Sequence, residues 1–255
     1  MKRELQHKQQ GKNMANKHTQ VDDIIETMRK NNGYATLAYL NQNVDTSSWI
    51  TKTPFESIRC YLQRRKEFFR IQPGLWALTD SKESVLKKFQ IKENGKEENE
   101  VFTHAYYQGL IVDIGNMKNL KTYVPAQDKN KMFLDKKLGE ISSIIDIPEF
   151  TYPKITNRAR TIDTIWFNER EMPNAFYEVE HSTNIINSLN KFYELQDFRA
   201  KFFIVADKKR KHEFEDKISQ SIYNSIKPLV NFVDYETLAN QHSKMAELFK
   251  SPVIL

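Results

Sequence analysis

The chain has 255 residues, a formal net charge of +6, and 39% hydrophobic and 12% aromatic residues. This composition supports packed cores, excludes a disordered chain, and suits two small domains. The one cysteine, Cys60, excludes an internal disulfide framework. No apolar run approaches the roughly 20 residues of a membrane span, and the polar, basic first residues do not resemble a secretory signal. We therefore expect a cytoplasmic protein without a membrane partner.

The positive charge is concentrated near the N-terminus. Residues 1–82 contain 14 Lys and Arg against 8 Asp and Glu, whereas the remainder contains 25 of each sign. A basic segment beside a neutral one indicates a part that binds a polyanion. A solvated surface with a basic tail would give the same counts, so charge alone leaves both interpretations open.

Residues 1–18 are rich in Lys, Gln, Asn and His, and they predict a disordered basic tail. Apolar residues at helical spacing then predict a first helix, which ends near Gly33: Val21, Ile24, Ile25 and Met28. A second helix is expected from about Ala35 to Asn41.

The sequence Thr53-Pro54-Phe55-Glu56 predicts a third helix, opened by a capping box and running to about Lys66. Two strands follow around the turn Pro73-Gly74, over 68–71 and 75–78. Three helices and a terminal hairpin predict a winged helix-turn-helix domain over residues 19–82. Its third helix would enter a DNA major groove.

The order Phe69-Arg70, Pro73-Gly74, Trp76-Ala77-Leu78 resembles the end of the HARE-HTH winged helix. That resemblance implies DNA binding and, in bacteria, fusion to restriction-type nucleases. Its basic side chains would neutralise phosphates. We expect these residues to contact DNA: Lys52, Thr53, Ser57, Arg59, Arg64, Arg65, Lys66 and Arg70. A winged helix that mediates protein contacts is the alternative.

The polar run from Glu93 to Glu100 predicts a charged linker over residues 83–100, followed by a second domain over 101–255. In that domain, β-branched and aromatic residues predict strands over 161–167 and 175–180, joined by a turn-rich stretch. A helix over 184–198, a buried strand over 201–207, a charged helix, a strand over 230–233 and a last helix follow. The expected fold class is α/β (α+β overall), with a mixed sheet flanked by helices.

Three acids lie within the two predicted strands, where carboxylates are difficult to solvate. Glu178 and Glu180 share one face of their strand, and Asp163 can face the same side from its neighbour. Three converging carboxylates repel one another unless a cation neutralises them, and hard oxygen ligands suit Mg²⁺. The alternative is an exposed sheet face whose acids pair with Lys or Arg.

The segments Ile162–Phe167 and Phe176–Thr183 resemble the PD-(D/E)XK nuclease fold, in its restriction-endonuclease branch, and the resemblance covers most of residues 101–235. It implies Asp163, Glu178 and Glu180 as catalytic residues. It also implies a metal held by Asp163, Glu178 and the Val179 carbonyl. Glu180 occupies the position where Lys is usual, so the general-base role stays open. Two auxiliary residues are candidates: Lys201 as a replacement for that lysine, and Glu140 as an extra helical acid.

The resulting hypothesis is a type II restriction endonuclease that cleaves double-stranded DNA at specific sequences with Mg²⁺. Two cuts need two active sites, which predicts a homodimer, and restriction predicts a companion DNA methyltransferase. Two alternatives remain: a nuclease specific for modified or damaged DNA, and a non-catalytic DNA-binding regulator. The six histidines lack Cys or His partners at zinc-ligand spacing. The seven glycines form no phosphate-binding loop.

Overall fold

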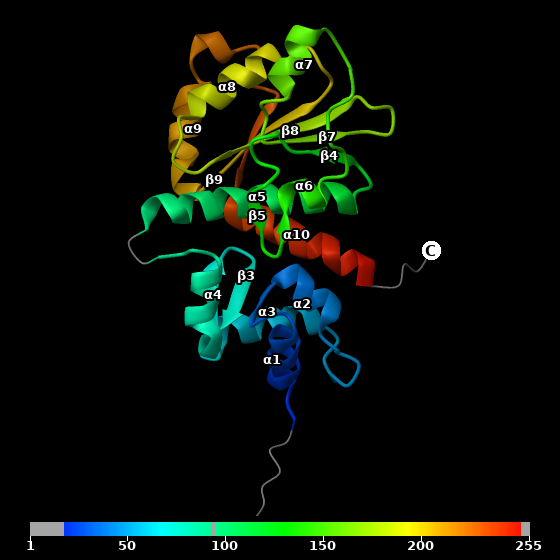
Figure 1. Ribbon diagram of the computed structural model, residues 1–255, viewed down its shortest axis with the longest axis vertical. Coiled ribbons are helices and arrows are strands. Elements are labelled where there is room, and N and C mark those ends of the chain that lie inside the picture. Colours follow the sequence, from blue (N-terminus) through cyan, green and yellow to red (C-terminus); the bar gives the residue numbers. More distant parts are fainter. Residues whose placement is uncertain (1–17, 93–94, 251–255) are drawn as a thin grey trace, which may run out of the picture.

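The computed structural model describes residues 18–92 and 95–250 as a mixed α/β structure, which confirms the expected fold class (Figure 1). The expected disordered tail, residues 1–18, lies outside the described residues except for His18. Within the described ranges, none of the helices has the length and apolar character needed to cross a membrane.

The N-terminal part contains the expected three helices and hairpin. Its elements are α1 (Gln20–Lys30), β1 (Tyr34–Thr36), α2 (Leu37–Asn43), α3 (Pro54–Arg64), β2 (Phe68–Gln72) and β3 (Leu75–Leu78). The three strands form an antiparallel sheet in the order β1-β3-β2.

Two local expectations for the N-terminal part are wrong. The start of the expected second helix is the strand β1, because the Thr36 side chain caps α2 by accepting a hydrogen bond from Tyr39 N at 3.0 Å. The capping box expected at Thr53 and Glu56 is absent, since the Thr53 side chain makes no cap hydrogen bond. Pro54, in the first turn of α3, suits a helix start by its fixed φ.

The stretch between the two parts is largely helical. Thr79–Ser81 forms a 3₁₀ turn, α4 spans Lys82–Lys88, and α5 (Lys96–Met117) begins inside the expected linker. Val85 and Phe89 are buried in one core cluster with Tyr34 of the N-terminal part. The apolar side chains in the first half of the expected linker therefore pack against the N-terminal part.

The C-terminal part is built on a five-stranded sheet in the order β10-β9-β8-β7-β4. The strands are β4 (Lys121–Tyr123), β7 (Thr164–Phe167), β8 (Pro173–Glu180), β9 (Lys201–Ala206) and β10 (Val230–Asp234). β4, β7 and β8 pair antiparallel, whereas β9 and β10 run parallel to β8. A small hairpin, β5 (Met132–Phe133) and β6 (Lys136–Lys137), precedes the short helix α6 (Leu138–Ile141).

Helices cover both faces of this sheet (Figure 1). Because side chains alternate along a strand, Phe176 packs with α8 (Ile185–Glu194) and α9 (Lys211–Ile218) on one face. Tyr177 and Val179 pack on the opposite face, towards α5 and α10 (Tyr235–Lys250). The helix α7 (Pro153–Ala159) lies beside α8.

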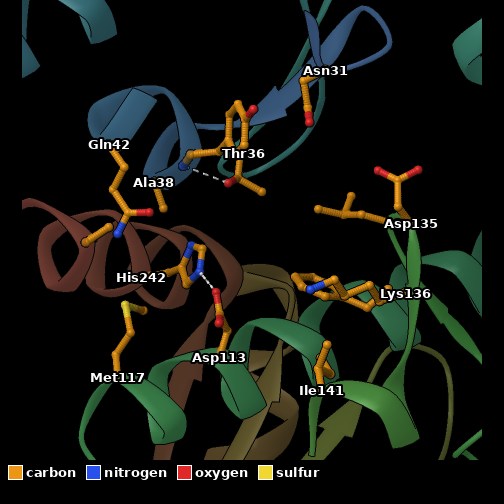
Figure 2. A pocket seen from close by; sticks show the side chains of 14 residues that line it. Asn31, Thr36, Ala38, Gln42, Asp113, Met117, Asp135, Lys136, Ile141 and His242 are labelled. Carbon is orange, nitrogen blue, oxygen red and sulfur yellow. Dashed lines mark hydrogen bonds and ion pairs between the residues drawn. The ribbon is translucent and has the colours of Figure 1, made fainter. Parts of the chain in front are cut away.

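The helices α5 and α10 lie between the two parts of the chain. A cavity of about 320 Å³ lies there, lined by residues of both parts (Figure 2). At its wall His242 of α10 hydrogen-bonds to Asp113 of α5 at 2.7 Å. The acids Asp163, Glu178 and Glu180 do not line this cavity.

Candidate active site

The structure brings Asp163 and Glu178 together at the open end of the β7–β8 hairpin, where β7 begins and β8 ends. Thr164 pairs with Tyr177, which places Asp163 opposite Glu178 at the next position. Asp163 N donates to Glu178 Oε1 at 3.3 Å, and Val179 N donates to Asp163 Oδ2 at 2.8 Å. The backbone of the hairpin therefore fixes the relative positions of the two carboxylates.

The surroundings of these two acids disfavour negative charge. Burial, reinforced by the charge of nearby Asp163, raises the pKa of Glu178 to about 8, although the Lys191 ammonium opposes the shift. Burial also raises the pKa of Asp163, against the influence of His104 and the Val179 N–H. Two adjacent acids that are costly to ionise favour a bound cation.

A lysine from outside the sheet reaches these acids. Lys191 Nζ of α8 lies 2.8 Å and 3.0 Å from the two oxygens of Glu178 and donates to the Thr161 carbonyl at 2.9 Å. Its side chain is 22% exposed, so the ammonium borders solvent. Lys191 was not among the site residues predicted from the sequence. One signal was available, because Ser188 and Lys191 are three residues apart on a helix whose apolar face packs on the sheet.

Glu180 is buried on the same face as Glu178, and hydroxyl groups surround it. Its carboxylate accepts hydrogen bonds from Thr183 and from Ser188, and Ser188 Oγ also lies 2.9 Å from Glu178 Oε2. The Arg210 guanidinium lies 4.0 Å from the Glu180 carboxylate and donates to the Glu180 carbonyl at 3.0 Å. Glu180 is thus close to Glu178, but its oxygens already have partners.

Lys201 and Glu140 are not brought to the acids. Lys201 pairs with Ala175, which lies three residues before Glu178 on β8. Lys201 is therefore about 10 Å from Glu178 along the strand direction, and its side chain is on the opposite face of the sheet. Glu140 accepts a hydrogen bond from Lys137 N at the start of α6. That helix packs near Asn116, about 18 Å along α5 from the end that faces Asp163.

A histidine and an aspartate approach Asp163 from the side of α5. His104 Nε2 lies 3.6 Å from Asp163 Oδ2 and 4.0 Å from Asp128 Oδ2. One ligand atom from each of the three residues lies within 4.8 Å of the others. Residue spacing could not reveal this group, since its members come from a helix, a loop and the edge of a strand.

The expected DNA-contacting residues fall into three groups. Five of them are exposed, namely Lys52, Thr53, Arg64, Arg65 and Lys66, while Ser57 and Arg59 are half-buried on α3. Arg70 is also exposed, but it donates to Glu236 of α10 at 2.6 Å, which directs it towards the C-terminal part.

Fold and site together define a mixed α/β protein with a buried cluster of acids and a lysine where β7 begins and β8 ends. Residues 85–251 match the family described as the type II restriction enzyme NmeDI C-terminal domain. This match covers more than half of the 255 residues, and the chain belongs to that family. It contains every acid of the site and Lys191.

A curated relative gives a more limited match. The type II restriction enzyme NmeDI of Neisseria meningitidis serogroup C is 27% identical over 99 residues, which are 37% of this chain and 28% of the relative. The chain therefore spans little more than a quarter of that relative's length. No solved structure matches the chain.

Proposed function

We propose that the chain is a type II restriction endonuclease, which hydrolyses phosphodiester bonds of double-stranded DNA through a PD-(D/E)XK nuclease domain. The observation that carries the proposal is the convergence of Asp163, Glu178 and Lys191 where β7 begins and β8 ends in a mixed sheet. Membership of a family of restriction-enzyme domains supports it.

Asp163, Glu178 and the Val179 carbonyl would hold Mg²⁺. The donor set fits this ion, because hard oxygen ligands suit it and two buried carboxylates need a compensating charge. When bound, the ion would neutralise charge on the scissile phosphate and lower the pKa of a nearby water.

Lys191 would fill the role of the missing strand lysine. Its ammonium lies at the edge of the site, where it can donate to a phosphate oxygen or to the attacking water without losing contact with Glu178. Glu180 would act beside it as a site carboxylate that Ser188 and Thr183 hold in place. Lys201, on the other face of the sheet, would take no part.

Residues 19–82 would bind DNA as a winged helix of the HARE-HTH kind, with α3 in the major groove. The exposed cations near the end of α3 would contact phosphates, and Arg70 would hold the hairpin against α10 instead. A homodimer would supply one active site for each strand. A companion methyltransferase would protect the host DNA.

The test is cleavage of long DNA, unmodified or methylated at cytosine or adenine, with Mg²⁺ or with EDTA. We expect discrete fragments with Mg²⁺ only, none from Asp163→Asn, and normal cutting by the matched control Lys201→Met. A dependence on methylation would identify a nuclease for modified DNA. DNA that shifts in a gel but stays uncut in every condition would refute the enzyme and favour the regulator.

A further inference from the structure

We infer that His104, Asp128 and Asp163 form a second cation site, which takes a transition-metal ion such as Mn²⁺ in preference to Mg²⁺. The distances from His104 Nε2, 3.6 Å to Asp163 Oδ2 and 4.0 Å to Asp128 Oδ2, agree with ligands that share one ion. Bonds of about 2.0–2.2 Å place neighbouring ligand atoms roughly 3–4.4 Å apart.

The histidine nitrogen has no other partner among the described residues. His104 Nε2 is buried and makes no hydrogen bond there, although its side chain as a whole is 23% exposed. Buried polar atoms are normally paired. A buried imidazole nitrogen near two carboxylates is what a metal ligand requires.

Neighbouring side chains hold the carboxylates of this site in position. Asp128 is almost fully buried, with Lys131 bound to Oδ1 at 2.6 Å and Gln108 Nε2 donating to Oδ2 at 3.1 Å. The same amide group donates to the Asp163 carbonyl at 2.5 Å. Such outer contacts commonly orient metal ligands and tune their affinity. Gln108 lies one helical turn after His104, so α5 sets both the ligand and its support.

The donor chemistry separates this site from the proposed magnesium site. Imidazole nitrogen favours transition metals, whereas an all-oxygen set suits Mg²⁺. Asp163 belongs to both sites, so its carboxylate would be a ligand that the two ions share. In its role for cleavage the second site rests on the proposed function, because two ions can stabilise both the attacking and the leaving oxygen of a phosphodiester. The binding of a metal ion at the second site does not depend on the proposed function.

The test is titration of the metal-free full-length protein with Mn²⁺, followed by electron paramagnetic resonance and by calorimetry. Wild type should bind two ions, and excess Mg²⁺ should displace only one of them. His104→Ala and Asp128→Asn should each weaken one site by about tenfold or more. Glu178→Gln should retain that site and weaken the other. His212→Ala, on the exposed face of α9, is the matched control.

His104→Gln serves as a second variant if alanine impairs folding, and thermal melts verify the fold of each protein. Unchanged Mn²⁺ stoichiometry and affinity in the His104 and Asp128 variants would overturn the inference and leave His104 as an ion-pair partner. Two-site binding without any DNA cleavage would refute the nuclease and leave the second cation site standing.

Discussion

Glu178→Gln should stabilise the metal-free protein while it abolishes cleavage. Without a cation, burial and the neighbouring Asp163 raise the pKa of Glu178 to about 8, against roughly 4.5 for an exposed glutamate. The native state therefore binds more protons than the unfolded state between those two values. The contribution of Glu178 to stability therefore falls as the pH rises from about 4.5 to about 8 and then levels off.

The size of the effect follows from that difference in pKa. Each unit corresponds to about 1.4 kcal/mol, and part of the shift belongs to the pair with Asp163. We therefore expect the free energy of unfolding of metal-free Glu178→Gln, relative to wild type, to be higher at pH 9 than at pH 5 by roughly 2–4 kcal/mol. Lys191 loses its ionic partner, but it borders solvent and can be hydrated.

The assay is urea unfolding in EDTA at pH 5 and pH 9, for wild type, Glu178→Gln and Glu215→Gln. The last variant is the control, since Glu215 is exposed on α9 beside Lys211. The difference between wild type and Glu178→Gln should change with pH, and the difference for the control should not. An identical pH dependence in all three proteins would refute the reasoning that burial and repulsion dominate at this site.

Three further predictions concern metal, lysine and DNA. Chelation of the metal, or Asp163→Asn, should reduce cleavage below detection in a fragment assay while DNA binding in a filter assay persists, and residual cutting would contradict the metal proposal. Lys191→Met should lower the single-turnover rate by about 10²–10³-fold, as the loss of one preorganised donor does. A normal rate would contradict the proposal that Lys191 fills the role of the missing strand lysine. Arg64→Ala should reduce the slope of log affinity against log salt by about 1. Arg70→Ala should leave that slope unchanged, because its guanidinium binds Glu236, and an equal loss in both variants would contradict this assignment.

The sequence was most informative where backbone periodicity determines position. The period of two in strands placed Glu178 and Glu180 on one face, and the paired strand brought Asp163 beside them. The N-terminal helices and hairpin were predictable because apolar spacing, the proline at the start of α3 and the Pro-Gly turn act locally. These features need no knowledge of how distant segments meet.

The missing parts of the site depend on tertiary contacts. Lys191 reaches Glu178 from α8, and His104 and Asp128 reach Asp163 from α5 and a loop. For His104 and Asp128, no pattern of residue spacing encodes such distances. The choice of Lys201 as an auxiliary residue illustrates the difficulty, because its strand is adjacent to Glu178 but its side chain belongs to the other face.

The helix α5 connects the candidate site with the N-terminal part. His104 faces Asp163, while two residues further on the Tyr106 hydroxyl donates to the Pro73 carbonyl in the hairpin turn at 2.9 Å. Gly74 in that turn has a φ of +80°, and a Cβ there would lie 2.9 Å from the Cβ of Ala239 on α10. The turn thus needs glycine both for its backbone conformation and for its close approach to α10. Since one buried cluster joins Tyr34 and Leu75 with residues of α5 and α10, the exposed cations near the end of α3 and the acids are held at a fixed distance. The proposed nuclease would therefore cut at a constant offset from the DNA that its proposed winged helix contacts.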